Sequence, residues 1–235
     1  MMETMEPIIV QHYKDYNDVY YSGSLGWFER WTHKSLEKFK QNSSNFIILD
    51  VGGGDGQHVP YIVGDYEKYI ILDLLDHSKT PNPGINKLNL SKLDFIIGDA
   101  EVLPFEDGSV DRVILTCVLH HVDSPVKVLS ECRRVLRDGG ILSVYLPNDP
   151  GMVYRWIRHF GAHMKYAKKT KRKISEIKFL WAVEHKNHIL GLNIIMKMIF
   201  RNDVIRRRSY PIPLGSWNTN LFQIYQIYVN KGSDV

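Results

Sequence analysis

A strand-like apolar run that ends in a cluster of glycines is the feature that most constrains this chain. Residues 46–56 read FIILDVGGGDG, and residues 46–51 are apolar enough to form a buried strand. Gly52, Gly54 and Gly56 follow at alternate positions. Glycines in such a turn let the backbone approach a ligand that a Cβ atom would keep away. The run therefore predicts a strand, a tight turn and a ligand-binding loop, with a helix following near residues 59–63.

Short apolar runs alternate with helical patterns along most of the chain. Further strands are expected at 69–75, 93–97, 112–118 and 141–146, and a helix at 124–136. Unbroken apolar strands separated by helices are typical of a parallel sheet covered on both faces, in a doubly wound α/β fold. After residue 151 the pattern changes to helices at 152–158, 174–183 and 187–200. Two strands at 205–212 and 222–229 are close enough in the chain to pair antiparallel.

Acidic residues follow the apolar runs where an open α/β sheet binds its ligands. Asp73 ends the second run, and an acid there can accept hydrogen bonds from both hydroxyls of a ribose. Asp99 follows the third run and can accept a hydrogen bond from an adenine amino group, beside the backbone amide of Ala100. The fourth run ends in His120 and His121. Polar residues thus stand at the ends of three apolar runs, and the glycine loop stands at the end of the first. This agreement is hard to assign to chance.

These motifs together resemble those of class I S-adenosylmethionine-dependent methyltransferases. Asp50-x-Gly52-x-Gly54-x-Gly56 matches the first motif of that family, and Asp73 matches the acid after its second strand. The segments 98–105 (GDAEVLPF), 119–122 (LHHV) and 131–140 also fit, and are similar to the subgroup of ubiquinone-pathway and related small-molecule methyltransferases. The resemblance covers about residues 45–147.

The resemblance implies a Rossmann-like sheet of seven strands, mostly parallel, with residues 204–235 supplying an antiparallel hairpin. It implies S-adenosylmethionine as cofactor and S-adenosylhomocysteine as product. The residues expected to bind the cofactor are Asp50, Gly52, Gly54, Gly56, Asp73, Asp99 and Ala100. A nicotinamide cofactor is disfavoured, because the Gly-x-Gly-x-x-Gly spacing is absent and Asp55 would repel a pyrophosphate.

We expect one domain over residues 1–235, in four parts. Residues 1–45 would form a helical cover, 46–147 the cofactor-binding core, 148–203 a basic helical insert on the substrate side, and 204–235 the hairpin. The resemblance implies that an N-terminal tyrosine reaches the amino-acid end of the cofactor, without deciding among Tyr13, Tyr16, Tyr20 and Tyr21.

Charge divides unevenly along the chain and bears on the methyl acceptor. Residues 1–145 hold 14 Lys and Arg against 21 acids, whereas residues 146–235 hold 16 against 5. The basic run at 165–173 is either a solvated face or a site for an anionic acceptor, such as a nucleotide sugar or a glycan. Residues 147–155, 184–188 and 216–222 resemble methyltransferases of bacterial surface polysaccharide synthesis, which makes O-methylation of a sugar the leading expectation.

Three other functions remain open. A quinone or aromatic acceptor fits the subgroup motifs but leaves the basic run unexplained. An RNA methyltransferase would also use a basic face, yet no RNA-binding module or Asn/Asp-Pro-Pro-aromatic signature occurs, so nucleic acid is disfavoured. A non-catalytic S-adenosylmethionine-binding module would be expected to carry a damaged glycine loop, and this loop is intact.

A catalytic base is needed only if the acceptor is a hydroxyl. His121 and Glu184 are the candidates, while His120 is expected to pack in the core. Asp149 follows the fifth strand and is either a turn residue or a substrate contact. No histidine spacing resembles a metal-ligand triad, so no metal site is expected.

Composition indicates a cytoplasmic protein. No window of 18 apolar residues occurs, and the first residues are acidic where a secretory leader would be basic. Cys117 and Cys132 lie in apolar or helical stretches, as small buried hydrophobes do. The sequence leaves the oligomeric state open.

Overall fold

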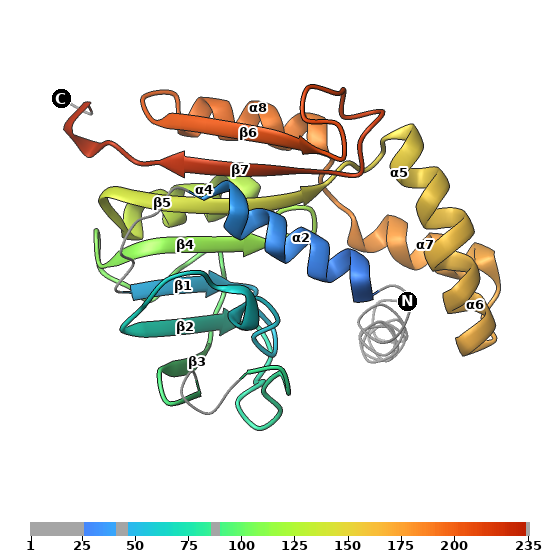
Figure 1. The fold of residues 1–235 in the computed structure, drawn as a ribbon, viewed down its shortest axis with the longest axis horizontal. Coiled ribbons are helices and arrows are strands. Elements are labelled where there is room, and N and C mark those ends of the chain that lie inside the picture. Colours follow the sequence, from blue (N-terminus) through green and yellow to red (C-terminus); the bar gives the residue numbers. More distant parts are fainter. Residues whose placement is uncertain (1–25, 41–46, 86–89, 234–235) are drawn as a thin grey trace.

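The computed structural model describes residues 26–40, 47–85 and 90–233, which form one twisted sheet with helices on both faces (Figure 1). The strands are β1 (Ile47–Val51), β2 (Lys68–Asp73), β3 (Leu93–Ile97), β4 (Val110–Thr116), β5 (Leu136–Pro147), β6 (Val204–Tyr210) and β7 (Phe222–Tyr228). The helices are α2 (Gly26–Phe39), α4 (Pro125–Val135), α5 (Met152–Ile157), α6 (Met164–Thr170), α7 (Ile174–Glu184) and α8 (Ile189–Ile199).

The seven strands lie in the order β3-β2-β1-β4-β5-β7-β6. Strands β1 to β5 pair in parallel, whereas β7 pairs antiparallel with both β5 and β6. This order confirms the predicted mostly parallel sheet with a C-terminal antiparallel hairpin. Because β1 to β5 run in the same direction, all five of their carboxyl ends meet at one edge of the sheet.

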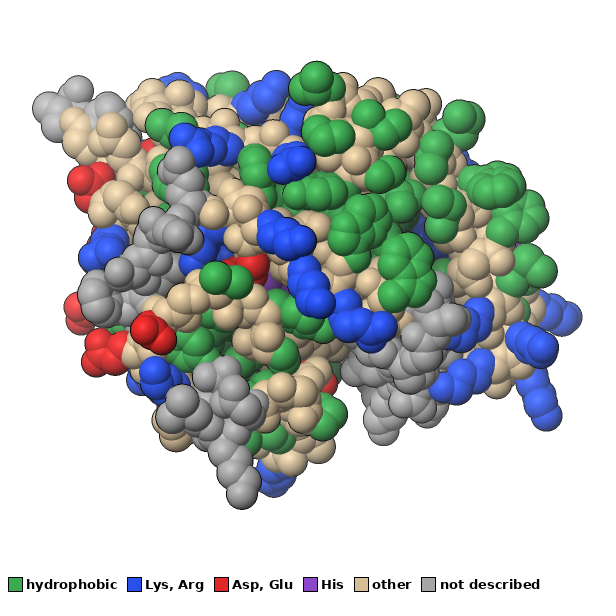
Figure 2. Space-filling view, viewed as in Figure 1, with side chains coloured by type: hydrophobic (Ala, Val, Ile, Leu, Met, Phe, Trp, Pro, Cys, Tyr) green, Lys and Arg blue, Asp and Glu red, His purple; other side chains and the backbone are tan. Residues whose placement is uncertain are grey.

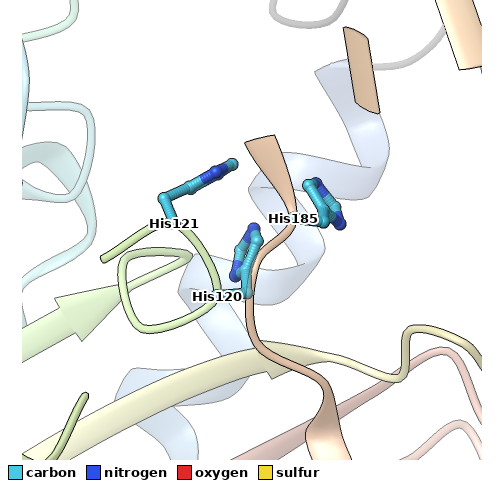
Figure 3. Close-up of side chains that lie close together, drawn as sticks. All are labelled: His120, His121 and His185. Atoms are coloured by element: carbon cyan, nitrogen blue, oxygen red, sulfur yellow. The ribbon is translucent and has the colours of Figure 1, made fainter. Parts of the chain in front are cut away.

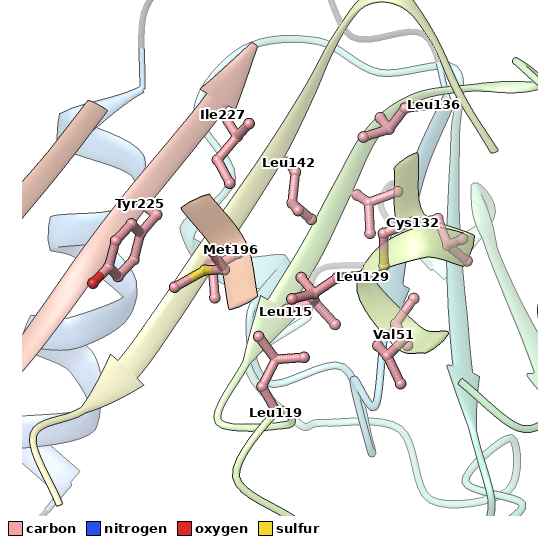
Figure 4. Close-up of a cluster of buried hydrophobic side chains, with 14 of the residues drawn as sticks. Val51, Leu115, Leu119, Leu129, Cys132, Leu136, Leu142, Met196, Tyr225 and Ile227 are labelled. Carbon is pink, nitrogen blue, oxygen red and sulfur yellow. The ribbon is translucent and has the colours of Figure 1, made fainter. Parts of the chain in front are cut away.

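One face of the sheet packs against α4 and α8. Leu129 and Cys132 of α4, together with Met196 of α8, lie against strand side chains such as Leu115 and Leu142, and all five are buried (Figure 4). Helix α8 is apolar almost all round, and its buried residues belong to the core cluster that α4 and the strands share. Cys132 thus behaves as a small buried hydrophobe, while Cys117 is half-buried, and both thiols are free.

The opposite face of the sheet packs against α2 (Figure 1). Leu36 of α2 is buried in the same apolar cluster as Tyr69 of β2 and Phe222 of β7. Helix α2 lies within residues 1–45, the part of the chain for which the sequence analysis expects a helical cover.

A charged network is buried between α2 and the sheet. Nη2 of Arg112 on β4 lies 2.6 Å from Oε1 of Glu37 on α2, and Nε of Arg112 donates to the hydroxyl of Ser143. Nε2 of His58 lies 3.0 Å from the same oxygen of Glu37, and Nδ1 of His58 lies 2.8 Å from Nδ1 of His33. All five side chains are buried, so the interface depends on their mutual pairing.

One local expectation is wrong. The helix expected at 59–63 is only a 3₁₀ turn, Val59–Tyr61, because Pro60 lacks a backbone donor and Gly64 follows with a φ of +99°. Part of the basic run at 165–173 lies in α6, which continues from a π-helical segment at Arg158–His163. A second 3₁₀ turn spans Lys231–Ser233.

Helices α5, α6 and α7 lie beyond the carboxyl ends of the parallel strands (Figure 1). Among the described residues, no helix has both the length and the apolar character needed to cross a membrane.

Candidate functional site

The glycine-rich loop after β1 adopts a backbone that requires glycine. Gly52 and Gly54 have φ values of +69° and +56°, in the left-handed region that other residues rarely adopt. A Cβ atom at Gly52 would lie 2.5 Å from Cγ2 of Val118, so the loop passes close to the segment after β4. A Cβ atom at Gly54 would meet none of the described residues within 4 Å. Among these residues the loop therefore leaves space beside its bare backbone, as a site for a small ligand would. Gly56, with a φ of +89°, closes the loop against Ile71 and Ile85.

Asp73 joins this loop to the end of β2. Its Oδ2 accepts a hydrogen bond of 3.1 Å from the backbone amide of Gly54, and its Oδ1 accepts one of 3.0 Å from that of Leu75. The side chain is partly exposed. Each carboxylate oxygen has two lone pairs, so both can accept a further hydrogen bond. Asp73 is thus held beside Gly54 with capacity for two neighbouring hydroxyls.

Asp50 lies beneath the loop and has no exposed surface. Its Oδ2 accepts a hydrogen bond of 2.6 Å from the Tyr69 hydroxyl, and its Oδ1 has no partner within the described segments. Burial raises the pKa of Asp50 to about 6. A Cβ atom at Gly53 would lie 2.7 Å from the Asp50 carboxyl carbon, so this side chain supports the loop from below.

Asp99 and Ala100 follow β3 at the same edge. Oδ1 of Asp99 accepts a hydrogen bond of 2.9 Å from the amide of Glu101, while the rest of the side chain is exposed. Ala100 is half-buried against the main core. The parallel pairing of β1, β2 and β3 therefore brings Asp50, the glycine loop, Asp73 and Asp99 to one edge, as the sequence predicts. The N-terminal tyrosines lie outside the described residues.

The loop after β4 is fixed by the connection between α7 and α8. The amides of Lys186 and Asn187 donate to the carbonyl of His120 over 2.8 and 3.2 Å. The side-chain amide of Asn187 donates to the carbonyls of Leu119 and Val122. Residues more than 60 positions apart in the chain are thereby held in contact.

The same contact brings three histidines together: His120, His121 and His185 (Figure 3). His120 and His121 belong to the loop after β4, and His185 directly follows α7. Their ring centroids are separated by 4.0, 4.5 and 5.2 Å. His120 and His185 are buried, with 4% and 7% of their surface exposed.

Asp149, after β5, holds His185 in place. Its Oδ2 lies 2.7 Å from Nδ1 of His185 and 2.7 Å from Nη1 of Arg158. Burial alone would raise the pKa of Asp149, but the hydrogen bond from His185 and the charge of Arg158 lower it to about 2. Asp149 is therefore ionised at neutral pH, and Arg158 also stacks over the Trp181 ring at 4.8 Å.

Burial keeps the three imidazoles uncharged. It lowers the pKa of His121 to about 4, with a further contribution from His185, and it lowers the pKa of His120 well below its usual value. Burial also lowers the pKa of His185, partly opposed by Asp149. Neutral imidazoles each keep one nitrogen lone pair, which can accept a proton or bind a metal ion.

Comparison with known proteins connects this architecture to a family. A family model described as a methyltransferase domain matches residues 49–144. A demethylmenaquinone methyltransferase of Lactobacillus johnsonii is 30% identical over 186 residues, which cover 73% of this chain and 72% of that protein. The chain belongs to the class I S-adenosylmethionine-dependent methyltransferases.

Two further comparisons cover less of the relative or concern only the fold. A chloroplastic 2-methyl-6-phytyl-1,4-hydroquinone methyltransferase of Oryza sativa is 29% identical over 59% of this chain, and the chain spans only about 41% of that protein. A solved S-adenosylmethionine-dependent methyltransferase of Aquifex aeolicus has a TM-score of 0.54 and 19% identity, covering 84% of this chain and 89% of that one. At that identity the likeness concerns the fold alone.

The family's cofactor is S-adenosylmethionine, and the loop of this methyltransferase fits it. The open space over Gly54 would take the ligand, and Asp73 offers acceptors to a ribose diol beside it. Asp55 adds an acid to the loop, and a sulfonium-bearing zwitterion tolerates an acid where a pyrophosphate does not.

Sequence reasoning missed most of the contacts around Asp149 and the histidines, at the carboxyl ends of β4 and β5. It singled out His121, Glu184 and Asp149 separately, but not the pairing of Asp149 with His185 and Arg158. The structure brings the Glu184 carbonyl to 3.1 Å from Nδ1 of His121. The sequence did hold a signal for placing Asp149 near the histidines. Asp149 follows β5 and His120 and His121 follow β4, and these neighbouring parallel strands have adjacent carboxyl ends.

Proposed function

We propose that this protein transfers a methyl group from S-adenosylmethionine to a small molecule with a large apolar part, of the hydroquinone or phenol class. The observation that carries the proposal is the apolar surface of the segment that follows Asp149. Trp156 of α5 and Phe160 of the π-helical segment are 65% and 56% exposed, and Met152 and Met164 are exposed beside them in the chain. Figure 2 shows hydrophobic side chains gathered on the side of the molecule where Figure 1 places α5.

Exposed aromatic and methionine side chains in this number favour contact with an apolar ligand. They begin three residues after Asp149, so they border the end of the sheet at which the acceptor would enter. The demethylmenaquinone and phytyl-hydroquinone methyltransferases among the relatives act on molecules of this chemical class, as their names state.

In this proposal the chain binds and aligns the two reactants. Bound S-adenosylmethionine supplies a methyl group on a positively charged sulfur. Gly52, Gly54 and Gly56 allow the loop to approach it, Asp73 accepts from its ribose, and Asp99 with the Ala100 amide contacts its adenine. Asp50 supports the loop from below. Alignment of this kind is the main requirement for an in-line displacement.

A hydroxyl acceptor also needs a proton acceptor. We propose His121, because its Nδ1–H donates to the Glu184 carbonyl and its Nε2 therefore carries the lone pair. The Glu184 carboxylate stays the second candidate. A His121→Gln variant should lower kcat on the true acceptor while leaving the Kd for S-adenosylmethionine unchanged. An unchanged kcat would remove His121 from this role.

A second acceptor class, the hydroxyl of an anionic sugar, is favoured by a different observation. Helix α6 and the residues after it carry the basic run, in which Lys168 and Lys173 are exposed. A nucleotide sugar or glycan would be attracted to that charge.

The experiment sets the two acceptors against each other. The purified protein is incubated with S-adenosylmethionine and either a short-chain isoprenoid naphthoquinol or a uridine-diphosphate uronic acid. Mass spectrometry then detects replacement of one hydrogen by methyl. Trp156→Ser should impair only the first reaction and Lys168→Glu only the second. Methylation of the sugar alone, lost in Lys168→Glu, would overturn the apolar acceptor, and methylation of neither by a protein that binds S-adenosylmethionine would overturn both.

A further inference from the structure

The three histidines after β4 and α7 meet in a way that packing alone does not explain. Each of His120, His121 and His185 offers one ring nitrogen, and these three atoms all lie within 4.8 Å of one another. Figure 3 shows the three side chains close together, on two separate segments of the chain. The positions are 120, 121 and 185, so chain spacing gives no hint of the cluster.

Hydrogen bonds already fix which nitrogen of two rings carries a lone pair. Nδ1 of His185 faces an ionised carboxylate that can only accept, so Nδ1 carries the proton and Nε2 the lone pair. Nδ1 of His121 faces the Glu184 carbonyl, which also only accepts, so Nε2 of His121 carries the lone pair. These partners therefore leave Nε2 of His121 and Nε2 of His185 each with a lone pair that can bind a ligand.

Two of these rings have a buried nitrogen without a protein partner. Nε2 of His185 and Nδ1 of His120 make no hydrogen bond within the described parts of the chain. A buried polar atom left without a partner costs about 1–3 kcal/mol, and such atoms are rare in native proteins. Two of them within one cluster, each on a ring that is more than nine-tenths buried, point to a bound species that satisfies both.

We infer that His120, His121 and His185 form a site for one divalent transition-metal ion, and we name Zn²⁺ as the probe. Three imidazole nitrogens are a ligand set that zinc uses, with the fourth position kept for water or another oxygen ligand. Asp149 bonds the outer nitrogen of His185, and in metal sites a carboxylate in that place fixes the ring and strengthens the ligand. The inference opposes the expectation from sequence that the chain holds no metal.

The nearest cation does not exclude an ion here. Arg158 is paired with Asp149 over 2.7 Å and stacked on Trp181, so a carboxylate offsets its charge. Glu184 lies on the other side, next to His185 in the chain. Lys186 is exposed and pairs with Asp123, so a carboxylate offsets its charge as well.

The site and the proposed base compete for the same atom. An ion would occupy the lone pair of His121 that proton transfer needs, so one protein molecule cannot use both at once. The inference stands on the three rings and their partners, and it holds whatever the acceptor of the proposed methyl transfer is.

The test measures metal binding directly. Protein freed of metal by dialysis against a chelator is titrated with Zn²⁺ by calorimetry, and with Co²⁺ while the visible absorption of the bound ion is recorded. We expect one equivalent of either metal, with an absorption typical of nitrogen-bound Co²⁺ of low coordination number.

Variants assign the binding to these rings. His120→Gln and His185→Gln should each abolish stoichiometric binding, and Asp149→Asn should weaken it by roughly 10- to 100-fold, as loss of an outer hydrogen-bonding partner does. His188→Gln is the matched control, because His188 lies on the same connection, three residues from His185, but is exposed. It should bind as the wild type does.

A fold control keeps the result decisive. The Kd for S-adenosylhomocysteine, which the glycine loop would bind, is measured for every variant and should stay within a few fold of the wild-type value. Metal binding that persists in both His120→Gln and His185→Gln would overturn the inference, as would the absence of stoichiometric binding by wild-type protein that binds S-adenosylhomocysteine. In the second case an internal water is the better partner for the two buried nitrogens.

Discussion

Gly54 and Gly64 form a natural pair for testing the loop. Both have a positive φ, and a Cβ atom at either would meet none of the described residues within 4 Å, but only Gly54 lies in the loop after β1. A side chain at either position costs backbone strain of about 1–2 kcal/mol, and the φ of +99° makes Gly64 the more strained of the two. Gly54→Leu should abolish binding of S-adenosylmethionine in calorimetry, whereas Gly64→Leu should preserve it. Equal loss in both variants would mean that strain, not occupation of the ligand space, is responsible.

Asp73 offers the sharper test of ribose recognition. Replacing its carboxylate by an amide removes charge-assisted acceptors that are worth about 1.5–3 kcal/mol, so Asp73→Asn should raise the Kd for S-adenosylmethionine roughly 10- to 100-fold. Asp94→Asn serves as control, since Asp94 is an exposed acid of β3 paired with Lys68. An unchanged Kd in Asp73→Asn would show that the acid only ties the loop to β2.

At the scale of elements, the contact between α2 and the sheet depends on Glu37. Glu37→Gln would leave the fully buried guanidinium of Arg112 without its carboxylate, which typically costs about 3–5 kcal/mol. Urea unfolding followed by circular dichroism measures that loss. The double variant Glu37→Leu/Arg112→Met should recover a large part of it, because both charges then leave the interior together. If the double variant does not recover stability, the contact of Glu37 with His58 is the one that stabilises the interface.

The same network makes stability depend on pH. Burial alone would raise the pKa of Glu37, but Arg112 and His58 hold it well below its usual value. Its stabilisation is therefore present above the unfolded value of about 4.5 and is lost as the pH falls below it. Burial also lowers the pKa of His33 well below 6.5, so protonation there favours unfolding as the pH falls through about 6.5. The free energy of unfolding should thus decrease from about pH 7 to pH 5, and a constant value would contradict the buried network.

For the whole molecule, cofactor binding should appear as thermal stabilisation. A ligand at a hundred times its Kd stabilises the folded state by about 2.7 kcal/mol. For a domain of this size, that free energy corresponds to a rise in Tm of about 5–10 °C. Scanning calorimetry with S-adenosylhomocysteine should show this rise in wild type and not in Gly54→Leu. A rise of equal size in Gly54→Leu would place the ligand elsewhere.

Much of the fold and half of the site follow from local patterns. The parallel strands are short apolar runs, and the end of each run marks the end of a strand. The glycine loop, Asp73 and Asp99 follow such ends, so they could be located without coordinates. His185 could not be placed, because its meeting with His120 depends on backbone bonds from Lys186 and Asn187 across the fold. The 3₁₀ turn at Val59–Tyr61 was mistaken for a helix because apolar spacing outweighed Pro60 in the prediction. The division into four parts stays a prediction.

Because β5 pairs with β7, the segment that the family model matches is shorter than the part of the chain that can fold by itself. The family model ends at residue 144, inside β5, whereas β7 begins at Phe222 and covers the outer edge of that strand. A fragment cut at the limit of the model would carry a bare strand edge and lose α8 from its apolar face, which is how aggregating fragments arise. Expression of the segment matched by the family model by itself should therefore give inclusion bodies, because it lacks the strand that pairs with the outer edge of β5.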